Sequence, residues 1–281
     1  MLRVPSEIAD DHFESLKIQE LTFVAYRSDV YPTKNEVYFE ENAVLYVLEG
    51  EKKFVGTDKQ VTVRKGDVFF VRRGYYLMSE SIDESYRSLV FFIDEKLIKD
   101  FVNQNVELFP KDKLEGKEMP TLLILPTDER FGKFAESVLP YFRSKTAYLH
   151  HFLKLKLQEL LLHLLSYDSG DFFKALLYQI FQGEKADLEY LMQNYYLKPL
   201  TIQELARLSG RSLSAFKRDF HEHFGAPPAK WIKEKRLERA AFLLKNSSKH
   251  VNEIAEEVAY ESVSHFIKAF KSKFGVTPAQ F

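Results

Sequence analysis

Two stretches near the C-terminal end of the chain share one pattern of apolar and polar residues, fifty positions apart. The first reads SLSAFKRDFHEHFG from Ser212, and the second reads SVSHFIKAFKSKFG from Ser262. In both, phenylalanine recurs every fourth residue, which is the spacing of one apolar face of a helix. The leading serine suits a helix N-cap, and the closing glycine suits a left-handed C-cap. Both stretches are therefore predicted to be amphipathic helices.

A shorter helical pattern precedes each of these helices, TIQELARL before the first and VNEIAEEV before the second. Thr201 is predicted to be the N-cap of the earlier short helix, with Glu204 at the capping-box position. A short helix, a tight turn and a longer helix form the helix-turn-helix plan. One copy would also fit a plain helical hairpin, but two matching copies favour a repeated unit. We predict helix-turn-helix units at about 201–224 and 250–274.

The segment between the two units is predicted to be one long helix, at about 227–245. It reads PPAKWIKEKRLERAAFLLKNS, and its paired prolines suit a helix start. About 19 residues at a rise of 1.5 Å span roughly 28 Å. Successive major grooves on one face of DNA lie roughly 34 Å apart. A rigid connector of this length would hold two recognition helices at a spacing suited to DNA.

The N-terminal part of the chain has a different pattern. Short runs rich in β-branched and aromatic residues, punctuated by glycine, continue to about Glu95. This pattern predicts an antiparallel, cupin-like β-barrel or a double-sheet jelly roll at about 20–95. Helices follow at about 95–168. The predicted fold class is therefore α+β with two domains, an N-terminal barrel with helices and an all-α C-terminal domain.

Domain boundaries follow from these patterns. We predict a regulatory and dimerisation domain at 1–168, a linker at 169–184 and a DNA-binding domain at 185–281. The predicted helix at 147–167 carries too many leucines for one narrow buried face. Such a wide apolar face is either a lid on the core or a subunit contact. We therefore expect a homodimer formed through helices 128–167 as one of two alternatives.

Charge supports this division of the chain. From Lys185 onward there are 16 Lys and Arg against 11 Asp and Glu, whereas the preceding residues carry 24 against 30. A basic C-terminal part after an acidic N-terminal part fits a DNA-binding domain joined to a regulatory domain. The chain has no cysteine, which excludes disulfides and thiolate metal sites. With no signal-like N-terminus and no membrane-length apolar run, a cytoplasmic protein is expected.

The barrel region lacks the residues of a metal enzyme. No histidine lies between Glu40 and Glu95, where a metal-dependent cupin would place its ligands. No metal, cofactor or catalytic residue is therefore predicted. The aromatic residues of this region could still line a pocket for a small molecule with an anionic group. The candidate ligand-binding residues are Arg64, Arg72, Arg73, Tyr75 and Tyr76. The alternative is that such aromatics form core and the arginines lie on the surface.

The C-terminal third of the chain resembles a known family. The runs ELARLSGRSLSAFKRDFHEHFG, RLERAAFLL and EIAEEVAYESVSHFIKAFKSKFGVTPAQF are similar to the DNA-binding domain of AraC/XylS transcription regulators. The resemblance extends from Asp187 to Phe281. The N-terminal VLEG, KGD and FVRRG spacing is more distantly similar to regulators of type III secretion genes, which are controlled by protein partners.

This resemblance implies that the second helix of each unit enters the major groove of DNA. Carried onto this sequence, the base-facing positions are Ser214, Ala215, Lys217, Arg218, Val263, Ser264, His265, Ile267 and Lys268. An arginine can pair bidentately with guanine, whereas an isoleucine can only touch a thymine methyl group. The second unit is therefore expected to contribute more to phosphate binding than to base reading. Candidate phosphate contacts are Thr201, Arg211, Ser212, Lys249, Ser262 and Lys271.

The predicted function is a sequence-specific regulator of transcription, an activator rather than an enzyme. Its expected partners are double-stranded DNA, RNA polymerase and a second copy of the chain, with no membrane association. A small-molecule effector or an anti-activator protein would act on the N-terminal domain by binding its states differently. The alternative is a metal-free, cupin-like ligand-binding protein or enzyme with an accessory DNA-binding domain.

Overall fold

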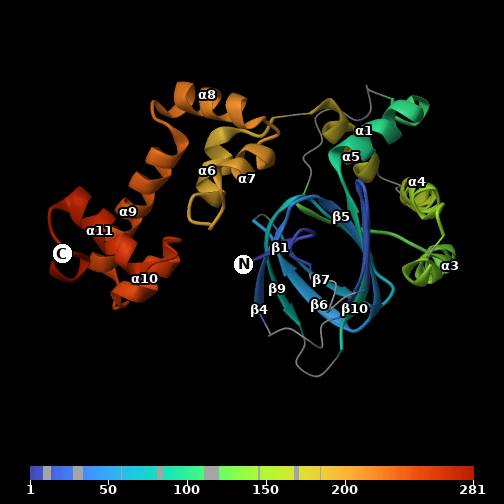
Figure 1. Cartoon of the computed structure of the whole chain (residues 1–281), viewed down its shortest axis with the longest axis horizontal. Helices are drawn as coiled ribbons and strands as arrows, with labels where there is room; N and C mark the ends of the chain where they lie inside the picture. Colours follow the sequence, from blue (N-terminus) through green and yellow to red (C-terminus); the bar gives the residue numbers. More distant parts are fainter. Residues whose placement is uncertain are drawn as a thin grey trace. The chain divides into compact units, whose positions relative to one another are not determined.

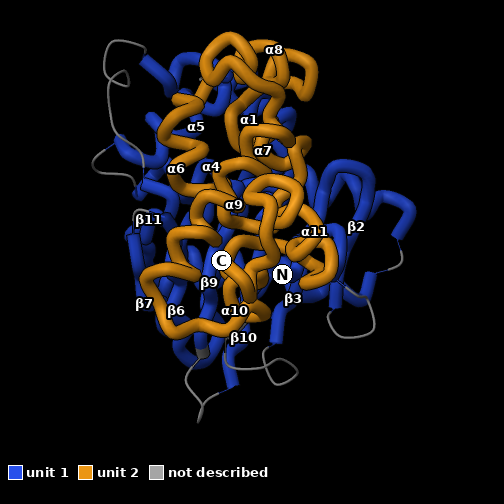
Figure 2. The backbone as a smooth tube through the Cα atoms, turned by 90° about the vertical axis from the view of Figure 1, so that its left-hand side faces the viewer, with its two compact units in different colours: residues 1–184 blue, residues 185–281 orange. Residues whose placement is uncertain are grey.

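The chain forms two compact units, residues 1–184 (unit 1) and 185–281 (unit 2) (Figures 1 and 2). The computed structural model describes residues 1–8, 14–27, 34–57, 59–80, 85–110, 120–144, 146–167, 171–183 and 185–281. In these ranges no helix is both long enough and apolar enough to cross a membrane. The predicted fold class is confirmed, because strands followed by helices make up unit 1 and unit 2 is helical.

The strands of unit 1 form two sheets rather than one closed barrel. They are β1 (Leu2–Val4), β2 (Glu14–Ile18), β3 (Leu21–Arg27), β4 (Lys34–Phe39), β5 (Asn42–Glu49), β6 (Glu51–Val55), β7 (Gln60–Arg64), β8 (Val68–Val71), β9 (Gly74–Glu80), β10 (Arg87–Ile93) and β11 (Leu122–Leu125). One sheet has the order β1-β4-β9-β6-β7, and the other has the order β11-β8-β5-β10-β3-β2. All pairs are antiparallel except β1 with β4.

The six-stranded sheet is buried on both faces, and its strands divide their side chains between two cores. In β10, Phe91 and Ile93 belong to a core shared with helices, whereas Val90 and Phe92 belong to a core between the two sheets. Strand side chains alternate between the faces of a sheet. A strand covered on both sides therefore reads as an uninterrupted apolar run, as RSLVFFI does.

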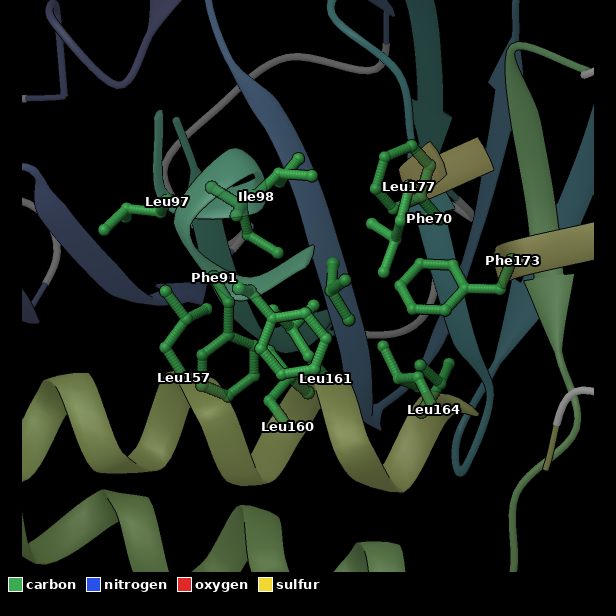
Figure 3. Packing of buried hydrophobic residues seen from close by; sticks show 14 of the residues in the cluster. Phe70, Phe91, Leu97, Ile98, Leu157, Leu160, Leu161, Leu164, Phe173 and Leu177 are labelled. Atoms are coloured by element: carbon green, nitrogen blue, oxygen red, sulfur yellow. The ribbon is translucent and has the colours of Figure 1, made fainter. Parts of the chain in front are cut away.

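In the described part of unit 1, four helices cover the outer face of this sheet. They are α1 (Glu95–Gln104), α3 (Glu129–Val138), α4 (Leu149–Tyr167) and α5 (Phe172–Gln182). Figure 3 shows the leucines of α4 pointing from the helix toward Phe91 of the sheet. Phe173 of α5 packs edge-on against Phe70, with ring centroids 5.7 Å apart. The predicted linker at 169–184 thus contains a helix that belongs to the core of unit 1, because its apolar face is buried there.

Unit 2 contains six α-helices and a short C-terminal 3-10 turn. They are α6 (Leu188–Tyr195), α7 (Ile202–Leu208), α8 (Leu213–Phe224), α9 (Pro228–Asn246), α10 (Val251–Glu257), α11 (Val263–Phe274) and η3 (Pro278–Gln280). The predicted long connecting helix is α9, and it contacts helices of both helix-turn-helix units. Leu237, Ala240 and Leu243 of α9 form one core with α10 and α11.

Two turns of unit 1 depend on glycine. Gly50 joins β5 to β6 at φ +75°, and Gly66 lies between β7 and β8 at φ +91°. Residues with a Cβ atom rarely adopt such angles. A Cβ atom on Gly50 would lie 2.6 Å from the carbonyl oxygen of Ser85, whereas one on Gly66 would meet nothing within 4 Å. Gly50 therefore has a steric role in addition to its conformational one.

Replacing these glycines with alanine is expected to separate the two effects. Gly66→Ala should cost about 1–2 kcal/mol, the penalty for a left-handed alanine. Gly50→Ala should cost at least about 1 kcal/mol more, because the backbone of Ser85 must move. Thermal unfolding of the two variants measures the difference. Equal losses of stability would show that the close approach at Gly50 has no energetic consequence.

Candidate nucleic-acid interface

The first helix-turn-helix unit forms as its sequence predicts. The backbone N–H of Thr201 donates to Glu204 Oε2 at 2.6 Å, and the N–H of Glu204 donates to Thr201 Oγ1 at 3.2 Å, so the predicted capping box is present. Ser212 caps α8 by accepting from the N–H of Ala215 at 3.2 Å. Phe216 and Phe220 are fully buried and anchor one face of α8. The opposite face is thereby left toward solvent.

The second unit repeats this construction with one difference in the turn. Ser262 caps α11, Gly275 ends it at φ +81°, and Phe266 and Phe270 are fully buried. The turn contains five residues, 258–262, where the first unit has four, 209–212. Ala259 adopts φ +55° in this turn, a conformation that Gly210 supplies at φ +69° in the first unit. Equivalent residues of the two longer helices are therefore 50 positions apart, whereas equivalent residues of the two shorter helices are 49 positions apart.

The predicted base-facing positions lie mainly on the exposed faces of α8 and α11. Ser214, Lys217, Arg218, Ser264, His265 and Lys268 are exposed, and Ala215, Val263 and Ile267 are half-buried. Val263 and Ile267 pack in part against the core of the second unit. Only part of each of these two side chains is thus available to a base.

An acidic residue organises three cations at the first recognition helix. Asp219 accepts from Arg211 Nε at 3.1 Å and from Arg218 Nη2 at 2.9 Å, and Lys185 Nζ lies 3.6 Å from the same carboxylate. The hydrogen bonds from Arg211 and then Arg218 hold the pKa of Asp219 below its usual range. The side chain of Arg218 is 65% exposed, so it is oriented by Asp219 yet open to a partner.

The geometry gives Arg211 structural partners, while its predicted contact with phosphate stays a prediction. Its side chain is only 10% exposed, and its guanidinium also donates to the carbonyl oxygens of Ala186 at 2.8 Å and Ser209 at 3.1 Å. Those bonds tie the turn of the first unit to the segment before α6. Arg211 is therefore a structural residue of the unit.

The other candidate phosphate contacts fall into two groups. Lys271 is exposed, and in the described part of the chain it forms no ion pair. Lys249 is paired with Glu257, which also lies 3.7 Å from Arg239. The hydroxyls of Thr201, Ser212 and Ser262 cap their helices, which leaves the helix N-termini rather than free hydroxyls to meet a phosphate.

Arg236, which the sequence did not single out, joins the segment before the first helix-turn-helix unit to the turn of the second. It lies on α9 and donates to the carbonyl oxygens of Tyr196 at 2.7 Å, Lys198 at 2.7 Å and Ala259 at 3.0 Å. These carbonyls lie just beyond the C-terminal ends of α6 and α10, where helix dipoles favour a cation. Burial lowers the pKa of this guanidinium. Among several Arg and Lys residues of α9, no local signal marks Arg236 as the buried one.

Known proteins match both units. The family model of the ExsA N-terminal regulatory domain matches residues 42–176, and that of a helix-turn-helix domain matches residues 205–281. The HTH-type transcriptional regulator ExsA of Pseudomonas aeruginosa is 26% identical over 244 residues, which cover 85% of each chain. The virulence regulon transcriptional activator VirF of Yersinia enterocolitica is 23% identical over 249 residues, 89% of this chain and 92% of that one. This chain belongs to the AraC/XylS family.

A solved structure is also similar to this AraC-family chain. It is ToxT from Vibrio cholerae with a bound unsaturated fatty acid. It is 19% identical over 94% of this chain and 95% of its own, with a TM-score of 0.43.

The regulatory unit of this AraC-family chain has an apolar cavity between its two sheets, but the predicted ligand-binding residues do not line it. Arg64 is turned outward to Glu51, and Arg73 pairs with Glu95 at 2.9 Å. Tyr76 donates to the carbonyl oxygens of Arg72 and Thr121. Tyr75 is buried, with its pKa raised by burial and by Glu36. None of the five is among the residues that line this cavity, and their role in ligand binding stays a prediction.

Replacing Arg236 should loosen the link between the two helix-turn-helix units of this AraC-family chain. Arg236→Gln would leave partly buried carbonyl oxygens without this guanidinium donor, at a cost of about 2–4 kcal/mol. Amide hydrogen exchange should accelerate at the C-terminal ends of α6 and α10. Lys235→Gln is the matched control, since Lys235 is the exposed neighbour of Arg236 and its described partners are Glu238 and the ring of Trp231. Unchanged protection in the Arg236 variant would contradict the linking role.

Proposed function

We propose that this protein is a sequence-specific DNA-binding activator of transcription, controlled through its N-terminal unit. The observation that carries the proposal is the pair of helix-turn-helix units in unit 2. Each has its phenylalanine face buried and a polar helix face exposed, and α9 and Arg236 hold them together. Such a pair is suited to two major grooves of one duplex.

The relatives support the activator role. VirF is named a transcriptional activator, and the domain that matches residues 42–176 is described as regulatory. An activator works through RNA polymerase, which we propose as a partner at the promoter. Selection of binding sites from random duplexes with the purified protein tests the proposal. It should enrich a motif that spans two successive turns of DNA, and enrichment of no motif would contradict it.

Base reading is assigned mainly to the first unit. Arg218 projects from α8 with its guanidinium exposed, and Asp219 limits its orientation. A bidentate contact with guanine requires such a fixed fork of donors. At the equivalent place on α11 stands Lys268, and the position that corresponds to Asp219 is Ala269. A lysine without an anchoring acid is better suited to a phosphate than to one base edge.

Two substitutions should have different effects on DNA binding. Arg218→Ala is expected to lower affinity for the selected site by about 1–3 kcal/mol and to relax one base preference. Lys271→Ala should weaken binding to all sequences about equally and reduce the salt dependence. Titrations against the selected site and against random DNA measure both effects. Equal losses on the two DNAs for Arg218→Ala would refute its base-reading role.

We propose that a second copy of the chain packs on the outer face of α4. Phe152, Leu155 and Leu162 are 42%, 60% and 46% exposed, although the inner face of the same helix is buried in the core. Tyr148, Phe152, Leu155, Glu159 and Leu162 follow one another at intervals of four and three residues. This spacing is typical of a helix seam that packs against a like helix.

Breaking this seam should produce monomers. Leu155→Glu would bury a carboxylate in an apolar contact, whereas Lys154→Glu, one residue away and off the seam, should leave assembly unchanged. Sedimentation equilibrium of the purified proteins measures the difference. A monomeric wild-type protein at high concentration, or a dimeric Leu155→Glu variant, would contradict this interface.

Control of the protein is proposed to act on unit 1 through a small molecule or an anti-activator protein. Either would need to bind the active and inactive states with different affinity. The cavity between the sheets favours a small molecule, and the exposed face of α4 is the surface that a protein would compete for.

A further inference from the structure

The chain enters unit 2 beside the turn of the first helix-turn-helix unit. Unit 2 begins at Lys185. The backbone N–H of Ala186 donates to the carbonyl oxygen of Ser209 at 3.1 Å, and Arg211 Nη1 donates to the carbonyl oxygen of Ala186 at 2.8 Å. These two hydrogen bonds fasten the first residues of unit 2 to the turn that precedes α8. A displacement of the chain at this junction would therefore reach the turn.

Arg211 is held in this turn by partners on two of its nitrogens. Its side chain is only 10% exposed, and Nη1 also donates to the carbonyl oxygen of Ser209 at 3.1 Å. Its Nε donates to Asp219 Oδ2 at 3.1 Å. A guanidinium is planar, so bonds from both sides of the plane's edge leave it little freedom to turn. Arg211 therefore fixes the carboxylate of Asp219 relative to the entering chain.

The other oxygen of this carboxylate contacts the proposed base-reading arginine. Asp219 Oδ1 accepts from Arg218 Nη2 at 2.9 Å, and the side chain of Asp219 is 19% exposed. A bidentate contact with guanine depends on the direction in which the fork of Arg218 points. The two oxygens of Asp219 thus connect the turn with the exposed side chain of Arg218.

The second helix-turn-helix unit folds without this connection. At the equivalent positions, 50 residues later, Glu261 stands in place of Arg211 and Ala269 in place of Asp219. The caps and buried phenylalanines of α11 nevertheless match those of α8. The pair of Arg211 and Asp219 is therefore not required by the helix-turn-helix fold. It occurs in the unit that lies next to the junction.

We propose that Arg211 is a positioning residue for base reading, and that it couples the junction at Ala186 to Arg218 through Asp219. A shift of the entering chain moves the carbonyl group of Ala186, and the hydrogen bonds of Arg211 and Asp219 carry this shift to Arg218. Discrimination between bases then changes, whereas the general attraction to phosphates does not. Unit 1 acts on base reading by this route. Because Arg218 reads a base only under the proposed function, the role of Arg211 rests on that function.

The test compares the affinity of the full-length protein for two duplexes. One is the selected site, and the other differs from it only at the base pair whose preference Arg218→Ala relaxes. The ratio of the two affinities measures base reading. Arg211→Gln should lower this ratio by about 3- to 10-fold, because Arg218 loses its fixed direction. A residue with a merely structural role would weaken binding to both duplexes and leave the ratio unchanged.

Lys185→Gln is the matched control. It removes one positive charge that lies 3.6 Å from Asp219 Oδ2, the same atom that Arg211 contacts. Lys185 is 53% exposed, however, and such exposed ion pairs contribute little, so the ratio should stay within about twofold of the wild-type value. A loss in Lys185→Gln as large as that in Arg211→Gln would contradict a specific role of Arg211.

A variant at the junction keeps the proposal testable if Arg211→Gln does not fold. Ala186→Pro removes the N–H that donates to Ser209 and changes no side chain of α8. It should lower the same ratio by about two- to fivefold. In the Arg218→Ala background, neither Arg211→Gln nor Ala186→Pro should change the ratio further, because both act through Arg218.

The failure of this coupling can be told from the failure of the proposed function. If Arg218→Ala relaxes a base preference but Arg211→Gln and Ala186→Pro leave the ratio unchanged, only the coupling is wrong. A change of the ratio by Arg211→Gln in the Arg218→Ala background would also overturn the coupling. If Arg218→Ala relaxes no base preference, both the base reading by Arg218 and its coupling to the junction are wrong.

Discussion

The DNA-binding unit depends on one partly buried guanidinium that donates to no carboxylate among its described contacts. Arg236 donates instead to three carbonyl oxygens beyond the ends of α6 and α10. Each helix end presents unpaired carbonyls and a partial negative charge, so one cation satisfies both. Because Arg236 itself lies on α9, it ties the segment after α6 and the turn of the second helix-turn-helix unit to one helix. The spacing of the recognition helices follows from this arrangement rather than from the surface residues.

The regulatory unit has an analogous constraint in its six-stranded sheet. Successive side chains of β10 alternate between a core under the helices and a core between the sheets. The helix-side core contains apolar and aromatic side chains, and Figure 3 shows how the leucines of α4 complete it. The inter-sheet core instead includes an ammonium and an unpartnered hydroxyl at its cavity.

Much of unit 2 could be predicted from the sequence because its signals are local. Caps, glycines and phenylalanine spacing act within a few residues, and the capping box at Thr201 and the left-handed Gly275 were found where they were expected. The 50-residue spacing of the longer helices does not reveal the extra residue in the second turn. The capping residues Glu204 and Glu253 differ by 49, which would have revealed it.

The sequence does not predict which side chains pair when the two residues are far apart in the chain. Arg211 has the positive charge expected of a phosphate contact, but its guanidinium donates a hydrogen bond to the carbonyl oxygen of Ala186, twenty-five residues earlier. In unit 1, the paired aromatics and arginines around Arg72 and Tyr75 give no indication of which member faces inward. A signal was present at Lys52 and Lys53, however. Adjacent residues of a strand point to opposite faces, so in a sheet with one dry face one of the two lysines had to be buried.

The two helix-turn-helix units share a backbone but differ in chemistry, and this difference determines what each contributes. In the first, Asp219 orients Arg218 and pairs with Arg211. In the second, Ala269 replaces the acid and Lys268 replaces the arginine, while Ile267 is partly committed to the core. A flexible lysine beside a half-buried isoleucine discriminates poorly between bases, but it neutralises phosphate well. Because α9 and Arg236 hold the two helix-turn-helix units at a set distance, a base-reading contact by one unit determines where on the DNA the other unit binds. Sequence discrimination in one unit is then enough to place both.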